Sequence, residues 1–179
     1  WESSNENVAM VSSNGVIVGI SSGTATVTGT TDDGGYSISI DVVVNSNPIA
    51  SGTCGDNPTW TLTKGGTLRI TGTGEMNNYY NDTTYARAPW YSDLETIKSV
   101  AIGKGVTNIV FGAFEGCSNL KSVTIPNSVT TIKGSAFKNC DKLTNVTIPN
   151  SVTSIGTMAF TGCTNLTKIN VDSDNAIYR

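Results

Sequence analysis

LKSVTIPNSVTTIKGSAFKNCDKL, residues 120–143, runs directly into a second copy of the same pattern, LTNVTIPNSVTSIGTMAFTGCTNL, residues 143–166. A looser copy begins at Ile97, so equivalent residues recur every 23 positions. A fixed period of this length is typical of a solenoid, in which each repeat forms one coil and stacks on the next. The sequence therefore predicts a repeat protein built from coils of 23 residues.

The same kinds of apolar residue return at the same place in every copy. A single coil cannot bury its apolar face alone, whereas stacked coils share one continuous core. The predicted core columns are Ile97, Leu120, Leu143 and Leu166; Val100, Val123, Val146 and Ile169; Ile102, Ile125, Ile148 and Val171; Val106, Val129 and Val152; Ile109, Ile132 and Ile155; and Phe114, Phe137 and Phe160. We therefore expect one core that runs the length of the repeats.

Each coil is expected to begin with a short β-strand. In residues 122–125, Val123 and Ile125 alternate with polar neighbours, which is the period of a strand, and Pro126 ends it because proline has no backbone donor. Successive strands stack in parallel and line one face of the solenoid, here called the strand face. Its outward positions are Ser99, Ala101, Ser122, Thr124, Asn145, Thr147, Lys168 and Asn170. The last six are the candidate partner-binding residues.

The repeat pattern is L-x-x-V-x-I-P-x-S-V-x-x-I-x-x-x-A-F-x-x-C-x-x-L. It resembles the BspA-like leucine-rich repeats of bacterial surface proteins. Residues 51–55, 60–62, 72–76 and 88–91 resemble that family's usual lead-in, so the likeness covers about residues 51–179. In the lead-in, alternating residues on both sides of a Lys64-Gly65-Gly66 turn predict a β-hairpin that caps the first coil. We assign residues 48–95 to this cap and 96–179 to the repeats.

Residues 1–47 follow a different pattern. Short alternating stretches separated by turns such as Asn14-Gly15 predict several strands and a β-sandwich. The segments WESSN at residue 1, VAMV at residue 8 and GTATVT at residue 23 resemble the bacterial Ig-like domain of group 2. Domains of that family have further strands ahead of the tryptophan at which this chain begins. We therefore expect a partial Ig-like sandwich that precedes the solenoid in a mainly β protein.

Both ends of the chain are expected to be cut from a longer protein. Residues 171–178 resemble the start of a further coil, so the repeats are predicted to be incomplete at the C-terminus. An incomplete sandwich exposes strand edges, and an exposed edge is a template for pairing with another chain. We therefore predict a homodimer through such an edge, which light scattering would detect.

Several functions are disfavoured by composition. Histidine is absent, so neither a Ser-His-Asp nor a Cys-His arrangement can be assembled within the chain. The chain lacks the Cys-x-x-Cys pairs of zinc sites, the arginine clusters of nucleic-acid sites and the long apolar run of a membrane span. We therefore expect no enzymatic activity, no cofactor, no metal, no nucleic acid and no membrane span.

Charge and cysteine placement are uneven. Residues 1–95 hold three basic and ten acidic residues, whereas residues 96–171 hold seven lysines and two acids. We interpret these lysines as a solvated fringe because they scatter over several faces, although a local field could also attract anionic polymers or acidic proteins. Cys117, Cys140 and Cys163 form one column and are predicted to be reduced core thiols. Cys54 has no evident partner.

Two functions remain. The family resemblance implies an extracellular protein, secreted or on the bacterial cell surface, that attaches to a host or matrix protein or to another surface protein through the strand face. The alternative is a carbohydrate-binding module that uses the tyrosine-rich lead-in. Tyr79, Tyr80 and Tyr85 are the candidate sugar contacts because they lie in a polar stretch with several asparagines. Trp90 and Tyr91 are instead expected to cover the open core of the first coil.

Overall fold

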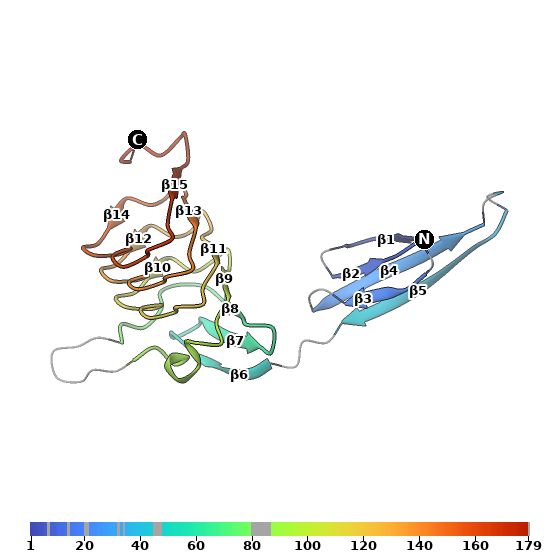
Figure 1. Cartoon of the computed structure of the whole chain (residues 1–179), viewed down its shortest axis with the longest axis horizontal. Coiled ribbons are helices and arrows are strands. Elements are labelled where there is room, and N and C mark those ends of the chain that lie inside the picture. The colour runs from blue at the N-terminus through green and yellow to red at the C-terminus, as the bar shows by residue number, and fades with distance from the viewer. Residues whose placement is uncertain are drawn as a thin grey trace. The chain divides into compact units, whose positions relative to one another are not determined.

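The computed structural model describes residues 1–6, 8–13, 15–19, 22–31, 33, 35–44, 48–79 and 87–178. The chain forms two compact units, Trp1–Asn47 and Pro48–Arg179 (Figure 1). Among the described residues, the regular structure is β-strand apart from one short 3-10 helix, η1 (Tyr91–Asp93). The predicted mainly β fold is confirmed.

The described residues of the first unit form five strands in two small sheets. The strands are β1 (Glu2–Ser3), β2 (Ala9–Val11), β3 (Ile17–Gly19), β4 (Gly23–Thr30) and β5 (Ser37–Val44). All pairings are antiparallel: β4 lies between β1 and β5, and β2 pairs with β3. Both hairpins expected from the turn residues are therefore present. Among the described residues, the outer edge of β5 has no ladder partner, and Ile38 and Ile40 on this strand are exposed. Dimerisation through such an edge stays a prediction.

The second unit starts with the predicted cap. Strands β6 (Pro48–Thr53), β7 (Thr59–Thr63) and β8 (Thr67–Thr71) form an antiparallel meander, with Gly66 in the left-handed turn between β7 and β8. Strand β8 then pairs in parallel with β9 (Ser99–Ile102), so that Leu68 aligns with Val100 and Ile70 with Ile102. The meander therefore closes the first end of the solenoid core, as expected for a cap.

The coils stack with two strand-bearing sides, seen on opposite flanks of the solenoid in Figure 1. The strand face is built from β9, β11 (Ser122–Thr124), β13 (Asn145–Ile148) and β15 (Lys168–Val171). The other side carries β10 (Asn108–Ile109), β12 (Thr131–Ile132) and β14 (Ser154–Ile155), which form a continuous parallel sheet. Each coil thus contributes one strand to each side.

A third side has no strands but is held together by hydrogen bonds between coils; we call it the turn side. The backbone N–H of Phe114 donates to Ala136 O at 2.8 Å, and the N–H of Phe137 donates to Ala159 O at the same distance. In each bond the acceptor lies 22 residues after the donor, so it belongs to the next coil. Interior backbone groups are therefore paired even where no strand is formed.

One feature of the strand face differs from expectation. Strand β11 pairs with β9, and β13 pairs with β15, but β11 and β13 belong to separate sheets. Strand β11 is shorter than β9 and β13, and Val123 and Ile125 are only partly buried. The strand face is therefore two adjacent sheets rather than one uninterrupted ladder.

An aromatic column runs through the turn side of the core. Phe114, Phe137 and Phe160 stack with ring centroids 5.2 and 5.4 Å apart, and Trp90 extends the stack below Phe114 at 5.6 Å. The Trp90 indole also donates to Ala113 O at 2.8 Å. The predicted cover of the first coil is therefore Trp90, which is fully buried. Tyr91 was expected to share this role, but it is 44% exposed because it lies in the 3-10 turn that leads away from the core.

The last described residues continue the stack. Asn175 is buried and donates to Pro149 O and Val152 O at 2.9 and 3.1 Å, while its own side-chain oxygen accepts from the N–H of Tyr178. The Tyr178 hydroxyl accepts a hydrogen bond from the Ile155 N–H at 2.9 Å. These bonds tie residues 172–178 to the third coil.

All four cysteines are free thiols, which confirms the predicted reduced column. Burial raises the pKa of Cys117 to about 12 and that of Cys54 to about 11, and it also raises the pKa values of Cys140 and Cys163. These thiols therefore remain protonated in the folded protein at pH values where an unfolded thiol has already ionised.

Alkaline pH is therefore expected to destabilise the second unit. Above about pH 9 the unfolded chain binds fewer protons than the folded one, so the free energy of unfolding falls as pH rises. At pH 10 the loss due to Cys117 alone is roughly 1 kcal/mol. Urea unfolding at pH 7.5 and pH 10 would measure it, and Cys117→Ala should reduce the difference between the two pH values by that amount. An unchanged difference in Cys117→Ala would contradict the prediction.

Candidate functional site

Alternating burial along the strands creates the strand face. In β13 the side chains of Val146 and Ile148 enter the core, whereas Asn145 and Thr147 point out and are exposed. Strand β15 pairs with β13 in register, so Asn145 lies beside Lys168 and Thr147 beside Asn170. The burial pattern is not repeated in β15, because Ile169, which was predicted to lie in the core, is 48% exposed and Asn170 is partly buried. The structure thus brings four of the six predicted partner-binding residues together on one two-stranded sheet.

The other two candidate residues lie on the neighbouring sheet. Ser122 is in register with Ser99, and Thr124 with Ala101, while β8 continues the rows with Thr67 and Arg69. The polar face therefore extends onto the cap, which the sequence reasoning did not include. The signal was present, because Leu68 and Ile70 alternate with Thr67 and Arg69 in the same way as the repeat strands. Arg69 adds an exposed cation to the uncharged part of the face.

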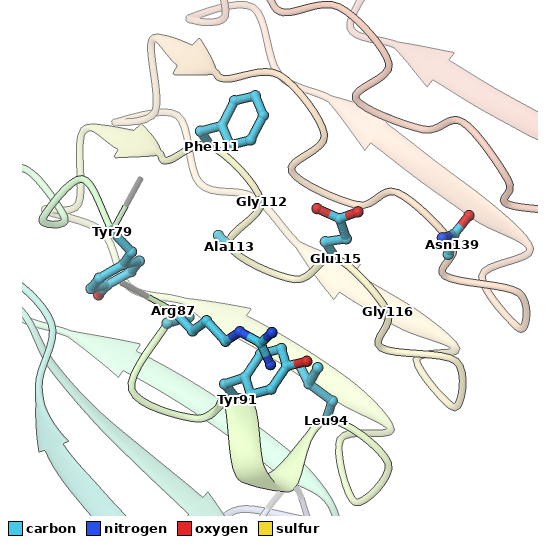
Figure 2. A pocket seen from close by; sticks show the side chains of 11 residues that line it. Tyr79, Arg87, Tyr91, Leu94, Phe111, Gly112, Ala113, Glu115, Gly116 and Asn139 are labelled. Carbon is cyan, nitrogen blue, oxygen red and sulfur yellow. The ribbon is translucent and has the colours of Figure 1, made fainter. Parts of the chain in front are cut away.

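A second candidate site is a hollow between the cap and the first coil, on the turn side, which we call the junction pocket (Figure 2). Its volume is about 600 Å³. The side chains that line it include Leu94 and six larger or polar ones: Tyr79, Arg87, Tyr91, Phe111, Glu115 and Asn139. Aromatic rings, a cation, a carboxylate and an amide thus surround one opening.

The predicted tyrosine site is placed only in part. Tyr79 lines the junction pocket, but its hydroxyl donates to Cys54 O at 3.1 Å and its ring lies edge-on to Trp90. These contacts fix Tyr79 within the cap. Tyr80 and Tyr85 lie outside the described residues. Tyr91 instead presents its ring beside the pocket, with the Arg87 guanidinium 3.8 Å above the ring centroid.

The residues that the structure describes form no cluster suited to a metal ion. Among them, no group of three or more cysteine, aspartate or glutamate side chains is close enough to hold a metal ion. Within the same residues, no helix is both long and apolar enough to span a membrane.

The stacked coils, the cap and the exposed strand face define a solenoid of the kind that serves as an interaction module. A model of the BspA type leucine rich repeat region matches residues 87–178 in six copies, and a model of the bacterial Ig-like domain, group 2, matches residues 1–42. The chain belongs to the BspA-type leucine-rich repeat family. Proteins of this type are typically bacterial surface proteins that act in protein interactions without catalysis.

Similar solved structures are also leucine-rich repeat proteins. One from Eubacterium ventriosum is 27% identical over 70% of this chain and 45% of that chain, with a TM-score of 0.45. A leucine rich cell surface protein from Faecalibacterium prausnitzii is 24% identical over 66% of this chain and 38% of that chain, with a TM-score of 0.41. The present chain thus spans less than half the length of either. No curated protein matches closely enough to count as a relative.

Proposed function

We propose that the chain is an adhesion module, secreted or displayed on the bacterial cell surface, whose strand face recognises a host or matrix protein or another surface protein. The supporting observation is the strand face itself, where short polar side chains lie in register over a buried apolar core. Extended surfaces of this kind are how solenoids bind partners, and proteins of this family typically act in protein interactions.

The composition of this face suits a broad, weakly hydrophobic contact. Ser, Thr and Asn side chains dominate the rows, and the charged side chains Arg69 and Lys168 lie on the first and last of its parallel strands. Small side chains lose little rotamer entropy when a partner covers them, and polar surfaces bind partners largely through hydrogen bonds and trapped water. The partner would therefore supply the large anchoring side chains.

The test is capture by the full chain from host mucosal extract and extracellular matrix, followed by an affinity measurement with the purified partner. A variant combining Asn145→Tyr, Thr147→Tyr and Lys168→Tyr places bulky rings across the sheet formed by β13 and β15. Tyrosine suits exposed strand positions, so the fold should persist. Affinity should fall at least tenfold, because the rings keep the partner away from the sheet.

Ser154→Tyr provides the matched control, since Ser154 is an exposed strand residue of the third coil on a different side. Its affinity should equal that of the unaltered chain. Equal affinity of the triple variant would move recognition away from the strand face, and loss in both variants would point to a general disturbance of the third coil.

A further inference from the structure

The first coil departs from the repeat where it borders the junction pocket. Three other described positions of this coil lie next to Phe111 on the same border: Gly112, Glu115 and Gly116. The equivalent residues of both following coils differ at three of these four positions, whereas Gly116 is matched by a glycine in the third coil. They are Gly134 and Thr157 for Phe111; Ser135 and Met158 for Gly112; Lys138 and Thr161 for Glu115; and Asn139 and Gly162 for Gly116. These departures lie together at one site, although the first coil also departs from the following two elsewhere, as at Gly103, Lys104 and Gly105.

Gly112 and Gly116 leave space beside the pocket, and the backbone conformation at these two positions does not require glycine. Gly112 and Gly116 have φ of +60° and +80°, a conformation that glycine adopts easily. Yet Ser135, Asn139 and Met158 adopt the same left-handed conformation at equivalent positions, with φ between +55° and +58°. A side chain is thus compatible with the backbone there. The effect of glycine at these two positions is to enlarge the junction pocket.

The surroundings confirm that this room is open. Among the described residues other than its chain neighbours, the atom nearest to a β-carbon at Gly112 would be Glu115 Oε2, at 3.4 Å. At Gly116 the nearest atom would be Leu94 Cδ1, at 3.8 Å. The resulting hollow of about 600 Å³ lies within the range of about 300–1,000 Å³ found for small-molecule sites.

The charge of the junction pocket is set by Arg87. The Glu115 carboxylate is offset by Lys138, whose ammonium lies 2.8 Å away. Arg87 forms no ion pair or hydrogen bond with any residue that the structure describes; its guanidinium carbon lies 3.8 Å from the centroid of the Tyr91 ring. The N–H groups of a guanidinium match a carboxylate in a two-point hydrogen bond. The pocket therefore favours a carboxylate-bearing ligand.

The remaining groups of a ligand would form hydrogen bonds with side chains of the pocket rather than with its backbone. The N–H groups of Gly112 and Gly116 already donate to Gly134 O and Lys138 O in the next coil. Peptides are most often recognised through free backbone groups at a strand edge or through a long groove, neither of which is formed here. Sugar hydroxyls both donate and accept, so they suit a site that mixes Glu115, an acceptor, with the amide of Asn139.

We propose that the junction pocket binds a sugar unit that carries a carboxylate, as in a uronic or sialic acid residue of a glycan. The carboxylate pairs with Arg87, the hydroxyls bond to Glu115 and Asn139, and the less polar face of the sugar ring packs toward Leu94 and the aromatic rings. Figure 2 shows these groups on both walls of the hollow, with Arg87 and Tyr91 from the cap and Glu115 from the coil.

Calorimetric titration of the full chain tests the proposal, with trigalacturonic acid and 3′-sialyllactose as separate probes and their methyl esters as matched neutral sugars. At least one acid should bind, and its ester should bind at least tenfold more weakly. Arg87→Ala should lower the affinity for the acid at least tenfold, and Arg87→Lys should retain part of it because the charge remains while the planar fork is lost.

A second variant fills the hollow without altering charge. The combination of Gly112→Ser and Gly116→Asn introduces the residues found at these left-handed positions in the second coil, so the fold should be retained and sugar binding lost. Met158→Ser is the control, since it makes a substitution at the equivalent position of the third coil, outside the pocket, and should bind as the unaltered chain does. Circular dichroism verifies the fold of each variant.

The proposal is overturned if neither acid binds, if esters and acids bind equally, or if binding persists in both Arg87→Ala and the double glycine variant. Binding of an acidic peptide such as tetraglutamate in place of both sugars would also overturn it. The pocket lies on the turn side and not on the strand face, so these results and those of the strand-face variants are independent of each other.

Discussion

Replacing Trp90 with alanine is expected to lower the free energy of unfolding of the second unit by about 3–5 kcal/mol. Trp90 is fully buried at the first end of the aromatic column, stacked on Phe114 and edge-on to Trp60. The substitution opens a large cavity between the cap and the first coil. It also leaves Ala113 O without the indole donor it now has.

Tyr91→Ala is the matched control, because this neighbouring aromatic residue is 44% exposed and lies outside the core. Its loss should cost less than about 1 kcal/mol, as for most exposed positions. Equilibrium urea unfolding followed by circular dichroism measures both. Similar losses in the two variants would show that Trp90 does not join the cap to the repeats in the way its contacts indicate.

Phe137→Ala should have a similarly large effect, about 3–5 kcal/mol. Phe137 is fully buried in the middle of the column, with Phe114 on one face and Phe160 on the other. Its removal deprives two neighbouring rings of contact at once and leaves a void between two coils. Because each coil rests on its neighbours, the cooperativity of unfolding should fall as well.

The position of a ring in the column should decide the size of the effect. Phe160 belongs to the same sequence column but is only partly buried and has one stacked neighbour among the described rings. Phe160→Ala should therefore cost less than half as much as Phe137→Ala. Phe137→Leu, which keeps most of the volume, should lose only about 1–2 kcal/mol. Equal losses at positions 137 and 160 would contradict the stacked arrangement.

The repeat period and the pattern of apolar residues were sufficient to predict the solenoid and most of its core columns, although Ile169 of the last strand is exposed. They could do so because a coil makes contacts chiefly with its neighbours, so local pattern and tertiary contact carry the same information. Leu120 and Leu143, for instance, could be placed in one core column from sequence spacing alone, and both are fully buried. The hairpins followed in the same way from turn residues between alternating stretches.

The junction pocket could not be read from the period, because it is made by departures from the repeat and by residues of the cap. Gly112 and Gly116 look like ordinary turn glycines in the sequence, and Tyr91 looks like a companion of Trp90. Only their arrangement shows that one aromatic residue enters the core while its neighbour holds the Arg87 guanidinium beside a hollow.

The sequence by itself thus determined the class of fold, the coil length and the identity of the core, since periodic burial is a local property of a solenoid. Tertiary structure alone decided where the strand face divides between β11 and β13, and that Glu115 of the junction pocket pairs with Lys138 of the next coil. Both depend on distances between groups far apart in the chain, such as Lys138 and Glu115, or Arg87 and the first coil. Pattern spacing does not encode these distances.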